Sequence, residues 1–260
     1  MRMAGFLFAT AAMSRTAIHP FAKIASGTTI GHFCVIESDV AIGRGCRLGH
    51  HVVVRAGTRI GEGVRIGDHA TLGAAPMRAS NSALRAGGPL ASLKVGAHCL
   101  IGAGVVLYQG CTLDEHVMVA DLATVREEVT VGMHTIIGRG VAVENACTIG
   151  ARCKLETNAY ITAYSTLEDH VFVAPGVLTS NDNFAGRTRE RYKHYKGVIA
   201  RRGARIGVGA VILPGKEIGE DALIAGGSVV TRDVPSRQVW ARNPARFFRN
   251  VPEAQLLENQ

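Results

Sequence analysis

The chain has 260 residues, of which 47% are hydrophobic and only 5% aromatic, with 31 glycines and a formal charge of +8. This apolar content excludes an intrinsically disordered chain, and the sequence has no run of 18 apolar residues that would suggest a membrane-spanning helix. Few aromatic residues beside many aliphatic ones predict a narrow core built from small side chains.

The first segment, residues 1–17, precedes the periodic part of the chain and is expected to form an N-terminal extension. Its stretch from Met1 to Met13 has one arginine, a short apolar run and an alanine-rich end, which is a weak signal-peptide pattern. The cysteines described below favour a cytoplasmic protein instead.

A period of six residues begins at Ile18. Every sixth residue is Ile, Leu or Val from Ile18 to Leu72, from Val95 to Val173 and from Ile206 to Val230, at 29 positions without a miss. Neither a helix of 3.6 residues per turn nor an alternating strand has this period. The pattern predicts short strands separated by corners.

A second restricted position lies four residues after each of these aliphatics, and it is Ala, Cys, Ser, Thr or Val in 27 of the 29 repeats. All six cysteines occupy it. They include no C-x-x-C pair, so we interpret them as small buried side chains rather than as disulfides or zinc ligands. Reduced thiols are typical of the cytoplasm.

Glycine often follows the aliphatic residue, as in Ile60-Gly61 and Ile101-Gly102. With this spacing the chain resembles the hexapeptide-repeat family. The resemblance implies an all-β fold, a left-handed parallel β-helix of about ten coils, in which three hexapeptides make one triangular coil of 18 residues. The β-helix is expected to cover residues 18–235.

Two interruptions of the period, residues 73–94 and 180–205, are predicted to be loops that leave the β-helix. Long loops in a repeat protein are usually functional. The period is lost after residue 235, and residues 236–260 are expected to cap the open sheet edge with a turn and a short C-terminal helix.

Residues 18 apart stack in successive coils, about 4.8 Å from one another. One predicted column holds Tyr108, Arg126, Glu144 and Thr162, and its neighbour holds Gln109, Glu127, Asn145 and Ala163. Part of this column is expected to be a structural ladder in which Arg126 pairs with Glu144. The columns lead to Asn181, Asp182 and Asn183, at the start of the second loop, and together they predict a site for a polyhydroxylated or amine-bearing substrate.

A third column holds His98, His116, His134, Arg152 and His170. Its spacing resembles the zinc site of the γ-class carbonic anhydrases, but the third histidine expected in that family is replaced by Arg139. We therefore expect no metal and interpret the column as a histidine stack, with His134 as an alternative catalytic base.

The positive charge is concentrated near the C-terminus. Residues 180–249 contain 14 Lys and Arg against 6 Asp and Glu, which accounts for the whole excess of +8. The sequence has no recognition helix or aromatic stacking platform for nucleic acid, so a phosphorylated small ligand is favoured.

The last coils, from Arg205-Ile206-Gly207 to Asp233-Val234-Pro235, and the segment Asn243-Pro244-Ala245-Arg246 resemble the C-terminal block of CoA-dependent hexapeptide acyltransferases. That resemblance implies acetyl-CoA as co-substrate and a homotrimer with active sites between subunits. It also implies a set of CoA-binding residues on this chain, namely Arg201, Arg202, Ala225, Gly226, Gly227, Arg232 and Arg246.

Four further segments are similar to N-acetyltransferases of nucleotide-linked 3-amino sugars: Val119-Ala120-Asp121-Leu122-Ala123, Val125-Arg126-Glu127, Ile161-Thr162-Ala163-Tyr164-Ser165 and Thr179-Ser180-Asn181-Asp182-Asn183-Phe184. The similarity implies substrate contacts from Tyr108, Asp121, Arg126 and the Asn181–Asn183 segment. In the related UDP-N-acetylglucosamine acyltransferases the catalytic residue is a histidine, and here Glu127 aligns with it.

The sequence therefore predicts an acyltransferase that transfers an acetyl group from CoA to the amine of a nucleotide-linked amino sugar, for cell-surface polysaccharide synthesis. Its predicted catalytic residues are Glu127, Glu144 and Asn145, with His134 as the alternative base. The alternatives are an acyltransferase for a hydroxyl, amino acid or xenobiotic acceptor, a zinc protein like the γ-class carbonic anhydrases, and a non-catalytic scaffold.

Overall fold

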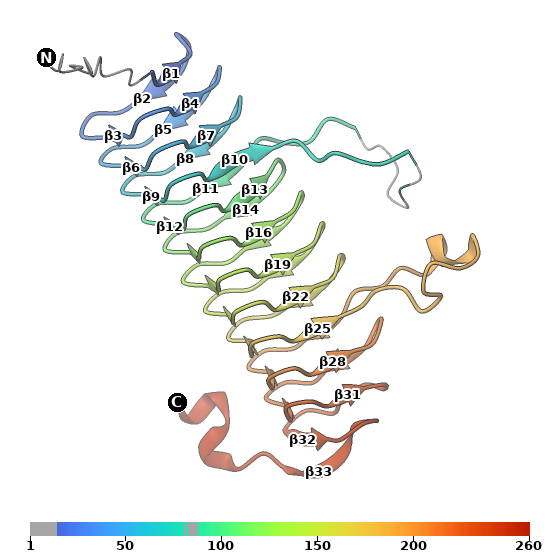
Figure 1. Cartoon of the computed structure of the whole chain (residues 1–260). Coiled ribbons are helices and arrows are strands. Elements are labelled where there is room, and N and C mark those ends of the chain that lie inside the picture. The colour runs from blue at the N-terminus through green and yellow to red at the C-terminus, as the bar shows by residue number, and fades with distance from the viewer. Residues whose placement is uncertain (1–14, 81, 83–87) are drawn as a thin grey trace, which may run out of the picture.

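The computed structural model describes residues 15–80, 82 and 88–260. The chain coils through three short strands per turn, and strands of successive turns pair in parallel to form the three sides of a long prism (Figure 1). This is the all-β, left-handed parallel β-helix that the resemblance to hexapeptide-repeat proteins implies.

Sheet A has 11 strands, in the order β1 (Ala17–Ile18), β4 (Val35–Ile36), β7 (Val53–Val54), β10 (Thr71–Ala74), β13 (Val106–Tyr108), β16 (Thr124–Val125), β19 (Ala142–Val143), β22 (Tyr160–Ile161), β25 (Leu178–Thr179), β28 (Val211–Ile212) and β31 (Val229–Val230). Sheet B has ten, in the order β2 (Lys23–Ile24), β5 (Ala41–Ile42), β8 (Arg59–Ile60), β11 (Lys94–Val95), β14 (Thr112–Leu113), β17 (Thr130–Val131), β20 (Thr148–Ile149), β23 (Thr166–Leu167), β26 (Ile199–Ala200) and β29 (Glu217–Ile218).

Sheet C has 12 strands, in the order β3 (Thr29–Ile30), β6 (Arg47–Leu48), β9 (Arg65–Ile66), β12 (Leu100–Ile101), β15 (Met118–Val119), β18 (Ile136–Ile137), β21 (Lys154–Leu155), β24 (Phe172–Val173), β27 (Arg205–Ile206), β30 (Leu223–Ile224), β32 (Gln238–Ala241) and β33 (Arg246–Asn250). Strands β1 to β30 make ten complete turns. An eleventh, made by β31, a bridge from Ile218 to Val234 and β32, adds to the predicted number of about ten.

The core follows from the hexapeptide. In most two-residue strands the second residue points inward and the first outward, as in β18, where Ile137 is fully buried and Ile136 is not. The small residue four positions later fills the next corner, and all six cysteines are buried there with free thiols. The interior is thus too narrow for rings, which explains the low aromatic content.

The second interruption is shorter than the sequence suggests, because two core positions carry residues outside the Ile, Leu and Val set. Thr179 of β25 pairs with Ile212, and Ala200 of β26 pairs with Leu167. The β-helix therefore resumes with strand β26 at Ile199, inside the predicted loop 180–205. The first loop likewise begins after β10, which ends at Ala74, and ends before β11 at Lys94.

The C-terminal segment differs from the expected turn and single helix. Strand β33 pairs antiparallel with β32 across the open edge of sheet C, and two short 3-10 turns follow, η2 (Glu253–Gln255) and η3 (Leu257–Asn259). Pro252 and Leu256, the N-cap residues of η2 and η3, have extended backbones, so the two turns do not join into one helix. A further 3-10 turn, η1 (Glu190–Lys193), lies in the second loop.

Among the described residues, no helix has the length and apolar character needed to cross a bilayer. The N-terminal segment with the weak signal-peptide pattern lies mostly outside the described residues.

Candidate acceptor site at the first corner

Each turn has three corners. We call the corner between sheets A and B the first, that between B and C the second, and that between C and A the third. Both long loops leave the helix at the first corner, after β10 and after β25, and Figure 1 shows them projecting on the same side. The corners of β13, β16, β19 and β22 lie between them.

Four of the predicted substrate or catalytic residues come together at this first corner. The Arg126 guanidinium donates hydrogen bonds to both carboxylate oxygens of Glu127, from Nε to Oε2 at 2.9 Å and from Nη2 to Oε1 at 3.3 Å. Its Nη1 lies 4.0 Å from Oε2 of Glu144. It also stacks on the ring of Tyr108, with 4.7 Å between Cζ and the ring centroid.

The first loop adds a residue that the sequence did not single out. Nη2 of Arg78 lies 3.5 Å from Glu127 Oε1, so the buried Glu127 carboxylate contacts two guanidinium groups. Its side chain is only 1% exposed. A carboxylate with so little exposure is tolerated because these two cations compensate its desolvation.

The two carboxyl groups at this corner differ in acidity. Burial alone would raise the pKa of Glu127, but hydrogen bonds from Arg126 and a backbone N–H, with the charges of Arg126 and Arg78, lower it overall. Burial raises the pKa of Glu144, the neighbouring Glu127 charge adds to this, and Arg126 only partly opposes it. Glu144 is therefore the better proton acceptor of the two near neutral pH.

Asn145, which follows Glu144 in the chain and stacks in the column of Glu127, is buried with 6% of its surface exposed. The Asn181–Asn183 segment follows β25 at the same corner, at the root of the second loop. There Asp182 accepts hydrogen bonds from the N–H groups of Phe184 and Gly186 and pairs with Arg191 at 3.1 Å, so its carboxylate organises the loop.

Two predicted residues lie at other corners. His134 is at the second corner, where its ring stacks on that of His116 at 5.0 Å, and His116 stacks on His98 at 5.1 Å. The structure thus shows the expected histidine stack but does not bring His134 to Glu127. No group of three His, Cys, Asp or Glu that is able to hold a metal ion occurs within the described part of the chain.

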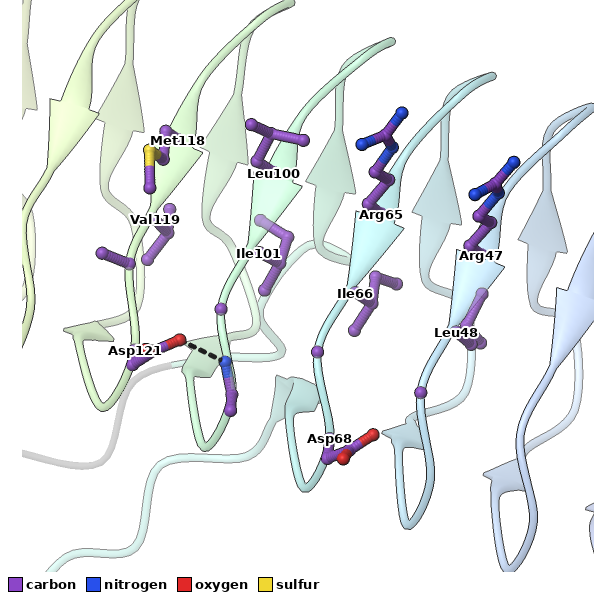
Figure 2. Close-up of a pocket in the computed structure, with 15 residues that line it drawn as sticks. Arg47, Leu48, Arg65, Ile66, Asp68, Leu100, Ile101, Met118, Val119 and Asp121 are labelled. Carbon is purple, nitrogen blue, oxygen red and sulfur yellow. Dashed lines mark hydrogen bonds between the residues drawn. The ribbon is translucent and has the colours of Figure 1, made fainter.

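Asp121 is at the third corner, beside a hollow of about 610 Å³ on the outer surface of sheet C. Figure 2 shows Arg47, Arg65, Leu100 and Met118 projecting from that sheet, whereas Asp121 Oδ1 accepts a hydrogen bond from the backbone N–H of Ala103 at 2.8 Å. Asp68 and Asp169 accept equivalent hydrogen bonds from their preceding coils. Asp121 therefore belongs to a corner ladder.

Comparison with known proteins finds family-model matches at both ends of the β-helix. The model described as bacterial transferase hexapeptide (six repeats) matches residues 21–56 and 39–74, and the model described as hexapeptide repeat of succinyl-transferase matches residues 202–232. In these segments the chain is similar to hexapeptide-repeat transferases. The matched segments are the first coils and the last coils of the β-helix.

Curated relatives match this hexapeptide-repeat protein only locally. A dTDP-3-amino-3,6-dideoxy-alpha-D-galactopyranose 3-N-acetyltransferase of Aneurinibacillus thermoaerophilus is 49% identical over 49 residues, 19% of this chain and 26% of that one. A 2,3,4,5-tetrahydropyridine-2,6-dicarboxylate N-acetyltransferase of Staphylococcus aureus is 41% identical over 58 residues, 22% and 24%. The chain thus spans about a quarter of the length of these curated relatives.

Solved structures share the fold over almost the whole chain. A UDP-N-acetylglucosamine acyltransferase from Arabidopsis has a TM-score of 0.53 at 18% identity, covering 92% of this chain and 73% of that one. The enzyme of the same name from Bacteroides fragilis also has a TM-score of 0.53, at 19% identity, covering 90% and 72%.

The residues predicted to bind CoA are divided among the corners of the hexapeptide prism. Ala225, Gly226 and Gly227 are at the third corner. Arg246 of β33 lies next to this corner, because the backbone N–H of Ala245 donates to the carbonyl of Val229 in β31, the strand that follows the corner. Arg201 and Arg202 are at the second corner and Arg232 is at the first.

The arginines also differ in availability. Arg201 is held by Glu168 at 2.9 Å and Glu217 at 2.7 Å, and Arg202 pairs with Glu220 at 3.4 Å. Sequence reasoning missed Arg205, which lies under the C-terminal segment with Nε and Nη2 buried and without a partner among the described residues. Its position in a strand resembled any other outward residue, so no sequence signal distinguished it.

The third corner of the last coils is unusually bare. Gly176, Gly209 and Gly227 stack there with positive φ angles of 66°, 64° and 66°, and a Cβ on any of them would meet no described atom within 4 Å. A stacked series of positions without side chains leaves the backbone open to close approach by an extended ligand.

Proposed function

We propose that this chain is an acetyl-CoA-dependent N-acyltransferase that acts on the amine of a nucleotide-linked amino sugar. The observation that carries the proposal is the first corner, where the accessible Glu144, whose pKa is raised by burial, lies beside the neutralised Arg126 and Glu127 pair. The relative from Aneurinibacillus thermoaerophilus, which by its name acetylates such an amine, supports the same acceptor class.

In the proposed reaction Glu144 accepts a proton from the substrate ammonium group. The free amine then attacks the thioester carbonyl carbon, the carbon–sulfur bond breaks, and an amide forms. Glu144 releases the first proton to solvent, then accepts the second nitrogen proton and passes it to the CoA thiolate, so atoms and charge balance. Glu127 keeps Arg126 in place, with Asn145 packed behind the pair.

The charge of the corner supports an amine-bearing rather than an acidic acceptor. Arg78 and Arg126 lie against Glu127 and Glu144, and Glu128 lines the adjacent recess, so three carboxylates against two guanidinium groups leave an excess of negative charge when all are ionised. An ammonium group is stabilised in such surroundings and a dicarboxylate is not. An acceptor like that named for the Staphylococcus aureus relative is therefore disfavoured.

We further propose that acetyl-CoA lies along the bare third corner at Ala225, Gly226 and Gly227, with its phosphates near the arginines of the last coils. Within one chain the third corner is separated by the width of sheet A from the first corner, where the acceptor is proposed to bind and which we call the acceptor corner. A homotrimer, in which the third corner of one copy faces the first corner of another, would bring donor and acceptor together. The need for acetyl-CoA as co-substrate and the six free thiols favour a cytoplasmic location for the protein.

The test is an acetyl-transfer assay with purified protein. Acetyl-CoA is supplied with dTDP- and UDP-linked 3-amino and 4-amino sugars, an amino-dicarboxylate, and a hydroxyl acceptor such as maltose, and released CoA thiol is followed with the product masses. We expect release only with amino sugars. Acetylation restricted to the hydroxyl or dicarboxylate acceptors, or to none of the panel, would overturn the proposal.

A further inference from the structure

The first loop forms a recess over the acceptor corner. Its outgoing residues Pro76 and Arg78 and its returning residues 88–90 enclose a space of about 450 Å³ together with Gln109 and Glu128. The recess is therefore lined by the loop on one side and by the coils of β13 and β16 on the other.

The root of this loop is fixed by a bulge in β10. Gly73 has a φ angle of 81°, and a Cβ on it would lie 2.6 Å from Oγ1 of Thr58. The bulge shifts the register so that Ala74 pairs with Tyr108 and its carbonyl accepts from the N–H of Gln109 at 3.0 Å. Arg78 follows four residues later and meets Glu127 of the coil of β16, two coils further along the prism.

Arg78 carries a donor that the protein leaves unused. Its Nη2 faces Glu127, but its Nε is buried and has no hydrogen-bond partner among the described residues. An unpaired buried N–H of a charged group costs more than an ordinary unmade hydrogen bond, so such a group is expected to gain a partner when a ligand binds.

The charges around Arg78 select the kind of partner. The carboxylates of Glu127, Glu128 and Glu144 already outnumber the guanidinium groups at this corner, so a further anion would be repelled. A neutral oxygen, the hydroxyl of a sugar, accepts a hydrogen bond without adding negative charge.

We propose that the recess under the first loop is the acceptor-sugar subsite and that Arg78 Nε donates to a sugar hydroxyl next to the reacting amine. This inference rests on the proposed function. It makes Arg78 a residue that selects hydroxylated amino sugars over their deoxy analogues, while Glu144 handles the proton.

The experiment compares wild type with Arg78→Met, which removes the donors, and Arg78→Lys, which keeps only the charge. The control is Arg44→Met, because Arg44 also pairs with a glutamate, Glu62, at 3.5 Å, but on an exposed surface of the first coils. Each variant is assayed with the best acceptor of the panel and with its analogue in which the neighbouring hydroxyl is replaced by hydrogen. Thermal unfolding shows whether each variant is folded.

With the hydroxylated acceptor we expect kcat/KM of Arg78→Met to fall by about 10- to 100-fold, mostly through KM, since a hydrogen bond to a charged donor has this strength. Arg78→Lys should recover little of the lost kcat/KM, and the control Arg44→Met should show no loss of kcat/KM. With the deoxy analogue, wild type and Arg78→Met should be nearly equal.

Equal losses on both acceptors, or no loss in Arg78→Met, would overturn the inference while leaving acetyl transfer by the wild type intact. Binding provides a second readout: calorimetry with dTDP-glucose, which has hydroxyls but no amine, should show weaker binding to Arg78→Met than to wild type. If wild type acetylates no amino sugar and binds no nucleotide sugar, the proposed function itself fails.

Discussion

At the scale of single residues, the acceptor corner separates two carboxylates that the sequence could not rank. Glu127 and Glu144 occupy neighbouring columns, and either one was a candidate base. The structure gives them different surroundings: Glu127 is enclosed by two guanidinium groups, whereas 27% of the Glu144 side chain is exposed. Arg126 contributes most to this difference and Arg78 adds to it. No sequence period predicted the Arg78 contact, because Arg78 comes from a loop.

Glu144→Gln should lower kcat by about 100-fold or more, since the variant cannot accept the ammonium proton. In the wild type, kcat/KM should fall as the pH drops through the raised pKa of Glu144, because the ionised form is the base. The measurement is a pH profile of acetyl transfer. A variant with wild-type kcat and the same acidic limb would contradict the assignment.

Glu127→Gln is expected to affect folding as well as turnover. The pKa of Glu127 is lowered in the folded protein, so its stabilising effect is present above the unfolded value of about 4.3 and is lost as the pH falls through the folded value. Urea unfolding should show the variant less stable by about 1 to 3 kcal/mol at neutral pH. The gap should narrow in acid, and a gap that is constant with pH would argue against the ionised pair.

At the scale of the strand and its corner, the hexapeptide predicted most of what is observed. Every inward aliphatic and every small corner residue has one place in a three-sided coil, so the core followed from the period. Thr179 and Ala200 broke the aliphatic rule while keeping their core positions, and this made the second loop look longer than it is. The antiparallel strand β33 was missed because a single pairing leaves no repeat.

The bare third corner makes a prediction of its own. Gly227→Ala should raise KM for acetyl-CoA by about 10-fold, since the methyl group occupies space that the ligand needs. The matched control is Gly45→Ala, which has a similar φ angle of 65° and equally open surroundings at another corner. Both variants should lose the same stability, about 1 kcal/mol. Equal KM values in the two would count against CoA at this corner.

The cysteine positions give a further test at this scale. Burial raises the pKa of Cys99 and Cys153 to about 11 and of Cys111 and Cys147 to about 12, and it also raises the pKa of Cys34 and Cys46. Thiolates are the reactive form, so the folded protein should react very slowly with Ellman's reagent near pH 8. All six thiols should react after unfolding in guanidinium. Rapid labelling of the native chain would show that the corners open.

At the scale of the whole molecule, sequence periodicity predicted the prism but not the arrangement of its functions around it. Stacked columns were visible in the sequence, whereas the corner to which each belongs depends on where the loops interrupt the count. The predicted CoA-binding residues consequently fall on three corners, whereas the predicted acceptor and catalytic residues other than His134 and Asp121 fall on the first. In the proposed homotrimer the two sets would meet through packing between copies, which a single chain's period does not encode.

The single tryptophan, Trp240, is 8% exposed and belongs to β32, the strand of the last turn that β33 covers. In a linear array each turn contacts only its neighbours, so the ends can unravel before the middle. Tryptophan fluorescence will therefore report the C-terminal cap, while circular dichroism averages over all the coils. We expect the fluorescence transition to come first on heating, and a folding study that relied on it alone would measure the fraying of one end as if it were the melting of the molecule.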